Sequence, residues 1–535
     1  MVQSTNVACS KLNHTEDVED VERTSVMNLK GSKQTRTMTL SSCVGVLLVF
    51  SLTILSVPAS AFAAEDEIDD QDITSHIEVE FWADQAVPAN AVNVKTVDGI
   101  VTLSGSVSNI LAKRRSEDIV AAVIGVRAII NRIVVRPKSH RSPGELEKAV
   151  RNALLKDPAT DSYEVEAGVN DGVVRLTGTV DSWQEKQLCA AVARSVAGVR
   201  EVDNQITINY DASRSDYEIQ QDVESRLAGD VRVDDGLIEV SIEDGEVILS
   251  GTVGSLQEER RAYANAWVAG VDAVETDRLE IQWWARDDMR RRSLYEDRPE
   301  EKIVQAVRDA LSYDPRVSAS HVNVEVEDRR VTLTSIVDNL ATRQAAGRDA
   351  RNTTGVFRVT NNVKVRPRDV PEDNKLKARV ATALENDPYI QRHNLDIGVD
   401  SGRIYLSGQV HTSWEKQRAA SVVETVKGVV RVINNLDYDR KWQWKPDWEI
   451  RERVQDELYW SPFVDSDEIE VGVNNGIVTL SGTVDNYSES QSAEDNAYEG
   501  GAKDVDNNLT VAREYYGPYR QSPYGRYDYF PPPVP

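Results

Sequence analysis

Cysteine is scarce in this sequence, with three in a chain of 535 residues. Cys9 and Cys43 precede Ala64, the expected start of the mature chain, so only Cys189 remains after that point. One cysteine cannot form an intrachain disulfide, even in an oxidising compartment. Disulfide-stabilised folds are therefore excluded.

Histidine is also scarce, and the sequence shows no reactive cluster. The six histidines occur singly and at no shared position of the internal repeat: His14, His76, His140, His321, His393 and His411. No H-E-x-x-H, paired-cysteine or phosphate-loop spacing is present. The dense carboxylates of residues 233–245 make calcium binding conceivable, but EF-hand spacing is absent. The sequence predicts a non-enzymatic protein with no metal and no cofactor.

An excess of positive charge is missing as well. The chain has 62 Lys and Arg against 88 Asp and Glu, which gives a formal net charge of −26. Because polyanions are repelled by such a surface, nucleic acid is excluded as a partner. Attraction to anionic lipid would need a local basic patch that acts against the field of the whole protein.

The only extended apolar run lies near the N-terminus, at residues 44–55. Lys30, Lys33 and Arg36 precede it, and an A-x-A pattern at 61–63 follows it. This order is typical of a secretory signal peptide, so residues 1–63 are expected to be a leader cleaved before Ala64. An uncleaved anchor is the alternative, although the run is shorter than the roughly 20 residues that a spanning helix needs.

One pattern dominates the rest of the chain. A hairpin-like stretch such as VNDGVVRLTGTV, at 169–180, returns with its turn glycine at intervals of 73 or 74 residues and one of 84. Three glycines recur in each copy, except that Arg329 and Ser335 replace the first two in the fourth. They are Gly99, Gly105, Gly125, Gly172, Gly178, Gly198, Gly245, Gly251, Gly270, Gly355, Gly402, Gly408, Gly428, Gly476, Gly482 and Gly501. Such self-similarity indicates six copies of one unit.

Each copy predicts the same order of elements. Residues 145–158 have an apolar stripe at i, i+4 and i+8, which is typical of an amphipathic helix. Two strands follow, joined by a tight turn in which aspartate and glycine are structural residues. Ser182 with Glu185 marks the start of a second helix, and the third glycine marks its end. The last strand closes an α-β-β-α-β unit, in which two helices must cover one face of a three-stranded sheet.

The repeated V-x-D-G-x-V-x-L-S-G-x-V and G-V-x-x-V-x-N-x-I motifs resemble the BON domain, named for bacterial osmotic-shock and nodulation proteins. The fold class is therefore α+β, with six tandem units, each a three-stranded mixed sheet covered by two helices. The expected units span 73–135, 144–208, 215–281, 299–365, 374–439 and 446–511, between the leader and a Tyr/Pro-rich tail at 512–535 that should be disordered or polyproline-like. The fourth hairpin, without its glycines, should be looser or differently turned.

The resemblance implies an exported protein of the periplasm or cell envelope. Its expected partner is a phospholipid membrane surface or an envelope protein, often under osmotic or envelope stress, and the family carries no catalytic residues over to this chain.

Two linkers combine tryptophan with basic residues, and they are the candidates for membrane contact because Trp prefers the headgroup level and cations favour anionic lipid. The candidate residues are Trp283, Trp284, Arg290, Arg291, Arg292, Lys441, Trp442, Trp444 and Lys445. The alternative is that the tryptophans wedge neighbouring units together and the arginines pair with nearby carboxylates.

Repetition itself favours a binding function. Several weak sites on one chain hold a repetitive surface more tightly than one site does, provided that the linkers let several engage at once. Two alternatives stay open. The first is a structural scaffold of stacked units with a protein or cell-wall partner. The second, disfavoured because no reactive cluster is visible, is an enzyme or small-ligand carrier.

Overall fold

The computed structural model describes residues 68–138, 141–160, 164–210, 214–287, 299–317, 322–368, 371–438, 444–511, 519–521 and 527–529. Residues Asp66–Pro535 group as one compact unit and Met1–Glu65 as another. The expected signal peptide lies outside the described residues.

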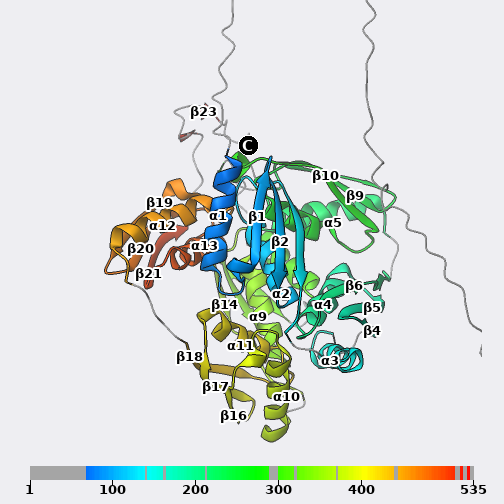
Figure 1. The fold of residues 1–535 in the computed structure, drawn as a ribbon. Helices are drawn as coiled ribbons and strands as arrows, with labels where there is room; N and C mark the ends of the chain where they lie inside the picture. The colour runs from blue at the N-terminus through cyan, green and yellow to red at the C-terminus, as the bar shows by residue number, and fades with distance from the viewer. Residues whose placement is uncertain are drawn as a thin grey trace, which may run out of the picture. The chain divides into compact units, whose positions relative to one another are not determined.

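The first repeat shows how the sequence pattern becomes structure (Figure 1). It consists of α1 (Asp70–Ala83), β1 (Val92–Val97), β2 (Ile100–Val107), α2 (Ile110–Ala121) and β3 (Ala128–Val135). The hairpin turn places Asp98 and Gly99 at positive φ, as a tight primed turn requires. Strand β2 lies in the centre of the sheet, antiparallel to β1 and parallel to β3. The sheet is therefore mixed, as predicted.

The other repeats follow the same order. The second has α3 (Pro143–Lys156), β4 (Glu164–Asn170), β5 (Val173–Val180), α4 (Trp183–Arg194), β6 (Glu201–Asn204) and β7 (Thr207–Ile208), and the third has α5 (Asp216–Gly229), β8 (Ile238–Glu243), β9 (Glu246–Val253), α6 (Leu256–Ala266) and β10 (Ala273–Ile281). The fourth has α8 (Glu300–Tyr313), β11 (Asn323–Glu327), β12 (Arg330–Thr334), β13 (Ile336–Val337), α9 (Leu340–Arg351), β14 (Arg358–Asn361) and β15 (Lys364–Val365).

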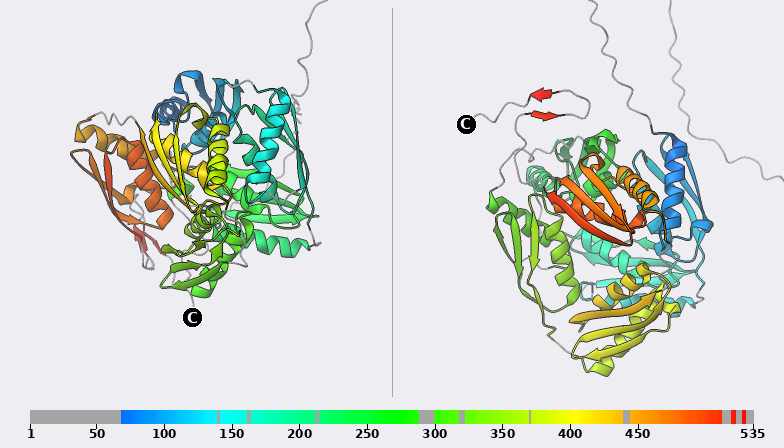
Figure 2. Two further views of the ribbon diagram at one scale, coloured as in Figure 1. Left: turned by 90° about the horizontal axis from the view of Figure 1, so that it is seen from below. Right: turned by 90° about the vertical axis from the view of Figure 1, so that its left-hand side faces the viewer.

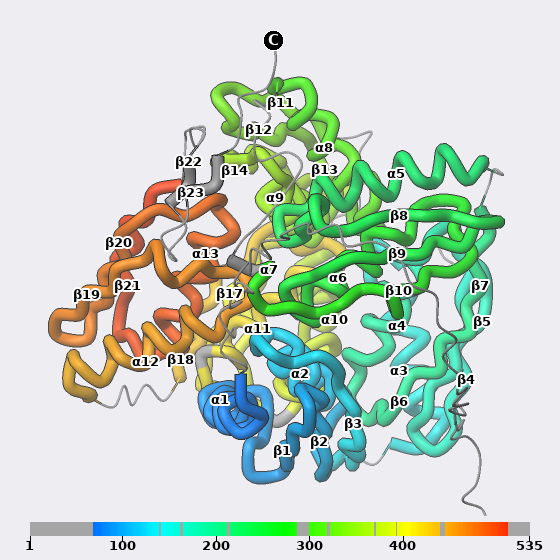
Figure 3. The backbone as a smooth tube through the Cα atoms, turned by 90° about the horizontal axis from the view of Figure 1, so that it is seen from above, coloured from blue at the N-terminus to red at the C-terminus, as the bar shows by residue number. Residues whose placement is uncertain are grey.

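The fifth has α10 (Asp373–Asn386), β16 (Asp396–Asp400), β17 (Arg403–Val410), α11 (Ser413–Glu424) and β18 (Arg431–Tyr438), and the sixth has α12 (Asp447–Trp460), β19 (Ile469–Asn474), β20 (Ile477–Val484), α13 (Tyr487–Glu499) and β21 (Asp504–Val511). Between the third and fourth repeats lies the short helix α7 (Trp284–Asp287). The chain path through one repeat can be followed in Figure 3 from α5 through β8 and β9 to α6 and β10.

Both helices of a repeat pack on one face of its sheet, as Figure 2 shows for α12 and α13 of the last repeat. The predicted stripe of Leu146, Val150 and Leu154 is buried, because these residues share the helix face that meets the sheet. The third, fourth and sixth repeats each have a core cluster of their own. The buried residues of the first, second and fifth repeats instead form one continuous cluster.

A polar contact fixes the last strand against the second helix. In the first repeat the Asn131 side chain donates to the Lys113 carbonyl of α2 at 3.4 Å and accepts from the Ile133 N–H at 2.9 Å. The asparagine of the repeated V-x-N-x-I motif makes the same two bonds in four other repeats. This polar residue is thus part of the fold.

The fourth repeat departs from the others in its second strand, not in its turn. Asp328 and Arg329 both adopt positive φ, and β11 pairs with β12 in register, so the prediction of a different turn was wrong. The strand breaks instead at Ser335, between β12 and β13. The glycines at this position elsewhere have φ of 119–134°, which a serine rarely adopts.

The tail contains two short strands, β22 (Tyr519–Gln521) and β23 (Tyr527–Tyr529), which pair antiparallel. This pairing differs from the disordered or polyproline-like tail that its composition favours. Among the described residues, no helix combines the length and apolar character that crossing a membrane requires.

Candidate ligand site

The structure places the linker candidates in different surroundings. Trp283 and Trp284 are half-buried, the second at the start of α7. Trp444 is 75% exposed, and the Lys445 ammonium lies 3.9 Å from the Glu449 carboxylate. Arg290, Arg291, Arg292, Lys441 and Trp442 lie outside the described residues. Of the described candidates, Trp444 is therefore the side chain most open to solvent.

The tryptophans that join repeats lie at helix ends and were not among the candidates. Trp183, which begins α4, stacks on Trp267 of the third repeat with ring centroids 5.8 Å apart. Trp414 of α11 packs edge-on against Tyr389, whose hydroxyl donates to the Ala86 carbonyl of the first repeat at 2.9 Å. Packing of repeats by aromatic side chains therefore occurs, although outside the linkers.

A cavity of about 600 Å³ lies between helices of the first, second and fifth repeats. Residues of α2, α3, α4, α10 and α11 line it, together with Arg316, which follows α8 of the fourth repeat. These are faces of helices that the sheets of their own repeats do not cover. The cavity is within the size range of small-molecule sites.

The lining combines apolar walls with positive charge. Leu111, Val192, Val196 and Val422 are among its apolar residues. Its charged residues are seven cations and two carboxylates: Arg114, Lys156, Arg194, Arg316, Arg379, Arg418 and Lys427, with Asp157 and Asp387. In a protein of net charge −26, this is a local reversal of sign.

The two carboxylates each hold one of the arginines. Asp387, at the C-terminal end of α10, contacts the Arg418 guanidinium at 2.8 Å, and Asp157 contacts Arg316 at 3.3 Å. These carboxylates are buried beside the cavity wall. The ion pairs fix two cations in place and leave the cation excess of the site at five.

Arg194 is a cation of the wall that is influenced by a second cation, Arg114. It is the last residue of α4, where the helix dipole favours a positive charge. Burial, and then the charge of Arg114, lower the pKa of its guanidinium. Burial is the larger cause and the Glu117 carboxylate opposes it, so a bound anion would offset a cost that comes mainly from desolvation of the guanidinium.

The chemistry of the cavity suits an anionic amphiphile. Apolar walls can hold an acyl chain, while guanidinium groups bind phosphate or carboxylate through charge-assisted hydrogen bonds. The site was not predicted from the sequence, because Lys156 and Arg194 lie at helix ends, where cations are ordinary partners of the helix dipole. Only the packing of the first, second, fourth and fifth repeats brings the seven cations together.

The fold and the cavity define a tandem-repeat protein built from α-β-β-α-β modules. The BON domain matches six times, over residues 69–137, 143–210, 215–282, 299–367, 372–440 and 446–513. Because these matches cover more than half of the chain, the protein belongs to the BON domain family.

Two relatives carry the same resemblance over part of the chain. Osmotically-inducible protein Y of Escherichia coli is 28% identical over 145 residues, which are 26% of this chain and 72% of the relative. Outer membrane lipoprotein DolP of Haemophilus influenzae is 32% identical over 163 residues, which are 29% of this chain and 84% of the relative. The solved C-terminal domain of CdsD, a structural protein of the type III secretion system of Chlamydia trachomatis, is 17% identical and matches 40% of this chain and all of that domain, with a TM-score of 0.12. That score is too low to support an argument.

Proposed function

We propose that this protein is a non-enzymatic protein of the cell envelope that binds anionic phospholipid through the cavity between its first, second and fifth repeats. The observation that carries the proposal is the gathering of seven cations on apolar walls in a protein of net charge −26. The two relatives, one osmotically inducible and one an outer membrane lipoprotein, support placement in the envelope and a role in osmotic or envelope stress.

Export and domain organisation are part of the same proposal. Residues 1–63 act as a cleaved signal peptide, and the six BON domains form the mature chain. Exposed Trp444 acts as an interfacial anchor, because its ring is available to a membrane surface while the neighbouring cations favour anionic headgroups. The half-buried Trp283 and Trp284 contribute less to this contact.

Cosedimentation with liposomes tests the proposal. The protein is mixed with neutral or anionic vesicles at low and at high salt, beside the variant Arg194→Gln/Arg379→Gln. A matched control, Arg175→Gln/Arg403→Gln, removes two charges from exposed strand positions outside the cavity. We expect salt-sensitive binding to anionic vesicles only, weakened about thirtyfold in the cavity variant and little changed in the control, since each of the two cations near bound anionic lipid contributes about 1 kcal/mol.

Equal loss in both variants would show that binding depends on overall charge and not on the cavity. Loss confined to a Trp444→Ala variant would move the contact to the linker. Binding of a soluble short-chain phospholipid without binding of vesicles would indicate a carrier.

A structural scaffold is the second candidate function, and contacts between repeats favour it. One buried cluster runs through the first, second and fifth repeats, and the Arg316–Asp157 pair joins the fourth to the second. A scaffold requires that the repeats stay docked without ligand. Limited proteolysis tests this requirement, since docked repeats resist cleavage in the linkers and separable repeats do not.

A further inference from the structure

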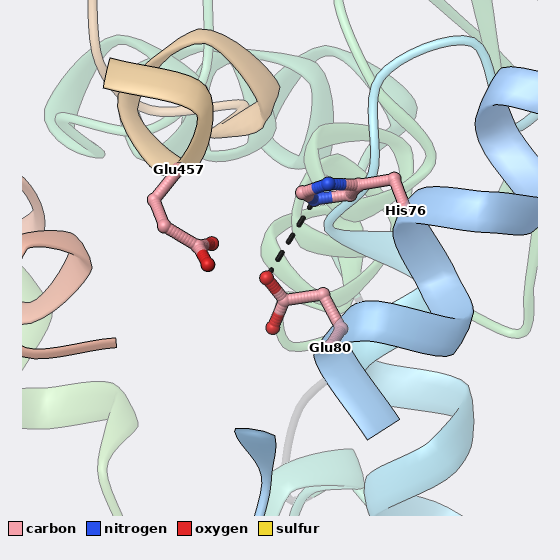
Figure 4. Close-up of side chains that lie close together, drawn as sticks. All are labelled: His76, Glu80 and Glu457. Carbon is pink, nitrogen blue, oxygen red and sulfur yellow. Dashed lines mark ion pairs between the residues drawn. The ribbon is translucent and has the colours of Figure 1, made fainter. Parts of the chain in front are cut away.

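A second polar cluster lies away from the cavity, between the first and the last repeat. His76 and Glu80 are one helical turn apart on α1, so both side chains lie on the same face of that helix. Glu457 reaches the same point from α12 of the sixth repeat. Figure 4 shows the three side chains converging, with a ring nitrogen of His76 facing Glu80 and the Glu457 carboxylate beside them.

The geometry is that of a set of ligands around one point. One nitrogen or oxygen atom from each of the three residues lies within 4.8 Å of the other two. The Nε2 atom of His76 is 3.6 Å from an oxygen of Glu80, which is too long for a hydrogen bond. Rotations of the glutamate side chains would bring these atoms to the roughly 2 Å from a common centre that zinc requires.

The His76 ring is held in position by an aromatic contact with the sixth repeat. Its ring stacks on Trp460 of the sixth repeat, with centroids 4.6 Å apart and planes 14° from parallel. Its side chain is only 10% exposed, and among the described residues neither ring nitrogen forms a hydrogen bond. The imidazole is directed into the cluster, where its Nε2 atom has the 3.6 Å contact with Glu80.

The charges of the cluster also suit a cation. A neutral imidazole nitrogen is a common ligand of transition metals, and that of His76 faces the two glutamates. The carboxyl groups of Glu80 and Glu457 lie close together, and a cation between them would offset their mutual repulsion.

We propose that His76, Glu80 and Glu457 form a binding site for a divalent transition metal ion of the zinc class, which fastens the first repeat to the sixth. Imidazole and carboxylate donors suit zinc, and three protein ligands with a water molecule complete its tetrahedral coordination. Calcium takes six to eight oxygen ligands, and magnesium keeps several waters and prefers oxygen, so both fit this set poorly. The site is independent of the lipid cavity.

Titration calorimetry of the chelator-treated protein with Zn²⁺ tests the site, beside His76→Ala and Glu457→Gln. Matched controls are Glu78→Gln and Glu452→Gln, exposed on the same two helices. We expect one ion per chain and a loss of affinity of at least about tenfold in each ligand variant, with the controls unchanged. A parallel titration with Co²⁺ should give the visible absorption of a tetrahedral site, which a loss of folding alone would not imitate.

A second readout addresses the link between repeats. Zn²⁺ should slow amide exchange at the facing turns of α1 and α12 in the unaltered protein and in Glu78→Gln, but not in Glu457→Gln, whose side chain keeps its size. Absence of Zn²⁺ binding, or binding that survives both ligand variants, would overturn the proposal. Binding without protection of both helices would also overturn it, because the site needs ligands from both.

Discussion

The second and fifth repeats both line the cavity, and in each a buried aspartate follows the first helix. The two repeats pair this aspartate with arginines from different places. In the fifth repeat, Asp387 at the end of the first helix pairs with Arg418, 31 residues further on in the second helix. The first and third repeats do the same with Asp84 and Asp230. The second repeat has Leu188 at the matching position, and its Asp157 pairs instead with Arg316 of the fourth repeat.

This difference shows how a repeat array gains contacts between its units. In the first, third and fifth repeats this ion pair lies within one module. In the second repeat, where leucine replaces the arginine, the aspartate forms a contact between two modules. The repeats are therefore not energetically independent. Loss of the ion pair should destabilise both the second and the fourth repeat, whereas loss of the pair in the fifth repeat should destabilise that repeat alone.

The largest effect is expected from Asp387→Ala. The change leaves the Arg418 guanidinium without its buried carboxylate and removes the acceptor for the N–H groups of Tyr389 and Ile390. Breaking a buried pair costs about 3 kcal/mol, so the fifth repeat should unfold at clearly lower urea. Hydrogen exchange in α10 and α11 locates the effect. Asp400→Ala, at an exposed turn, is the control, and an equal loss there would contradict the argument.

A smaller effect, confined to the contact between repeats, is expected from Arg316→Gln. Cys189 of α4 is fully buried, and burial raises the pKa of its thiol to about 12. At pH 8 the folded thiol therefore stays protonated and reacts with an alkylating reagent only when the second repeat opens. Loss of about 1 kcal/mol should raise the alkylation rate of Cys189 about fivefold, measured by mass spectrometry of its peptide.

Adding Leu188→Arg to Arg316→Gln would give the second repeat the internal ion pair that the first, third and fifth repeats have. The new arginine lies where the first, third and fifth repeats carry theirs, so it should partly restore slow alkylation of Cys189. Its aliphatic stem can cover the apolar surface that Leu188 covers. Alkylation that stays as fast as in Arg316→Gln would show that the ion pair does not control the stability of the second repeat.

The smallest effect is expected from Trp444→Ala. Because the side chain is 75% exposed, the free energy of unfolding should change by less than about 0.5 kcal/mol in urea titrations. The same change should weaken binding to anionic vesicles more than binding to a soluble phospholipid. A large loss of stability would instead show that this tryptophan packs between repeats.

The sequence predicts the modules well because their determinants are local. The glycine positions, the Asp-Gly turns and the caps at Ser182, Ser255 and Asn486 report backbone geometry directly, and each of these three residues accepts a hydrogen bond from the backbone of its helix. The turn of the fourth repeat shows where prediction from local residues fails. Arg329 adopts a positive φ that glycine would favour, because the pairing of β11 with β12 imposes it.

The sites could not be predicted in the same way. Arg194, Arg316 and Arg379 belong to three repeats, and each alone is an ordinary charged residue of a helix or loop. His76 and Glu457 are hundreds of residues apart, and nothing local marks either as a ligand. Their proximity depends on how modules dock, which is decided by long-range packing and not by the repeated pattern.

Lipid binding in the cavity is tested most directly by photo-crosslinking of the protein with an anionic phospholipid that carries a photoreactive acyl chain, followed by mapping of the modified peptides. Lipid binding in the cavity predicts crosslinks in α4, α10 and α11, at apolar residues such as Val192 and Val422, which unlabelled anionic lipid competes away and Arg194→Gln/Arg379→Gln reduces. Crosslinks confined to the segment around Trp444, or spread evenly over the surface, would contradict it.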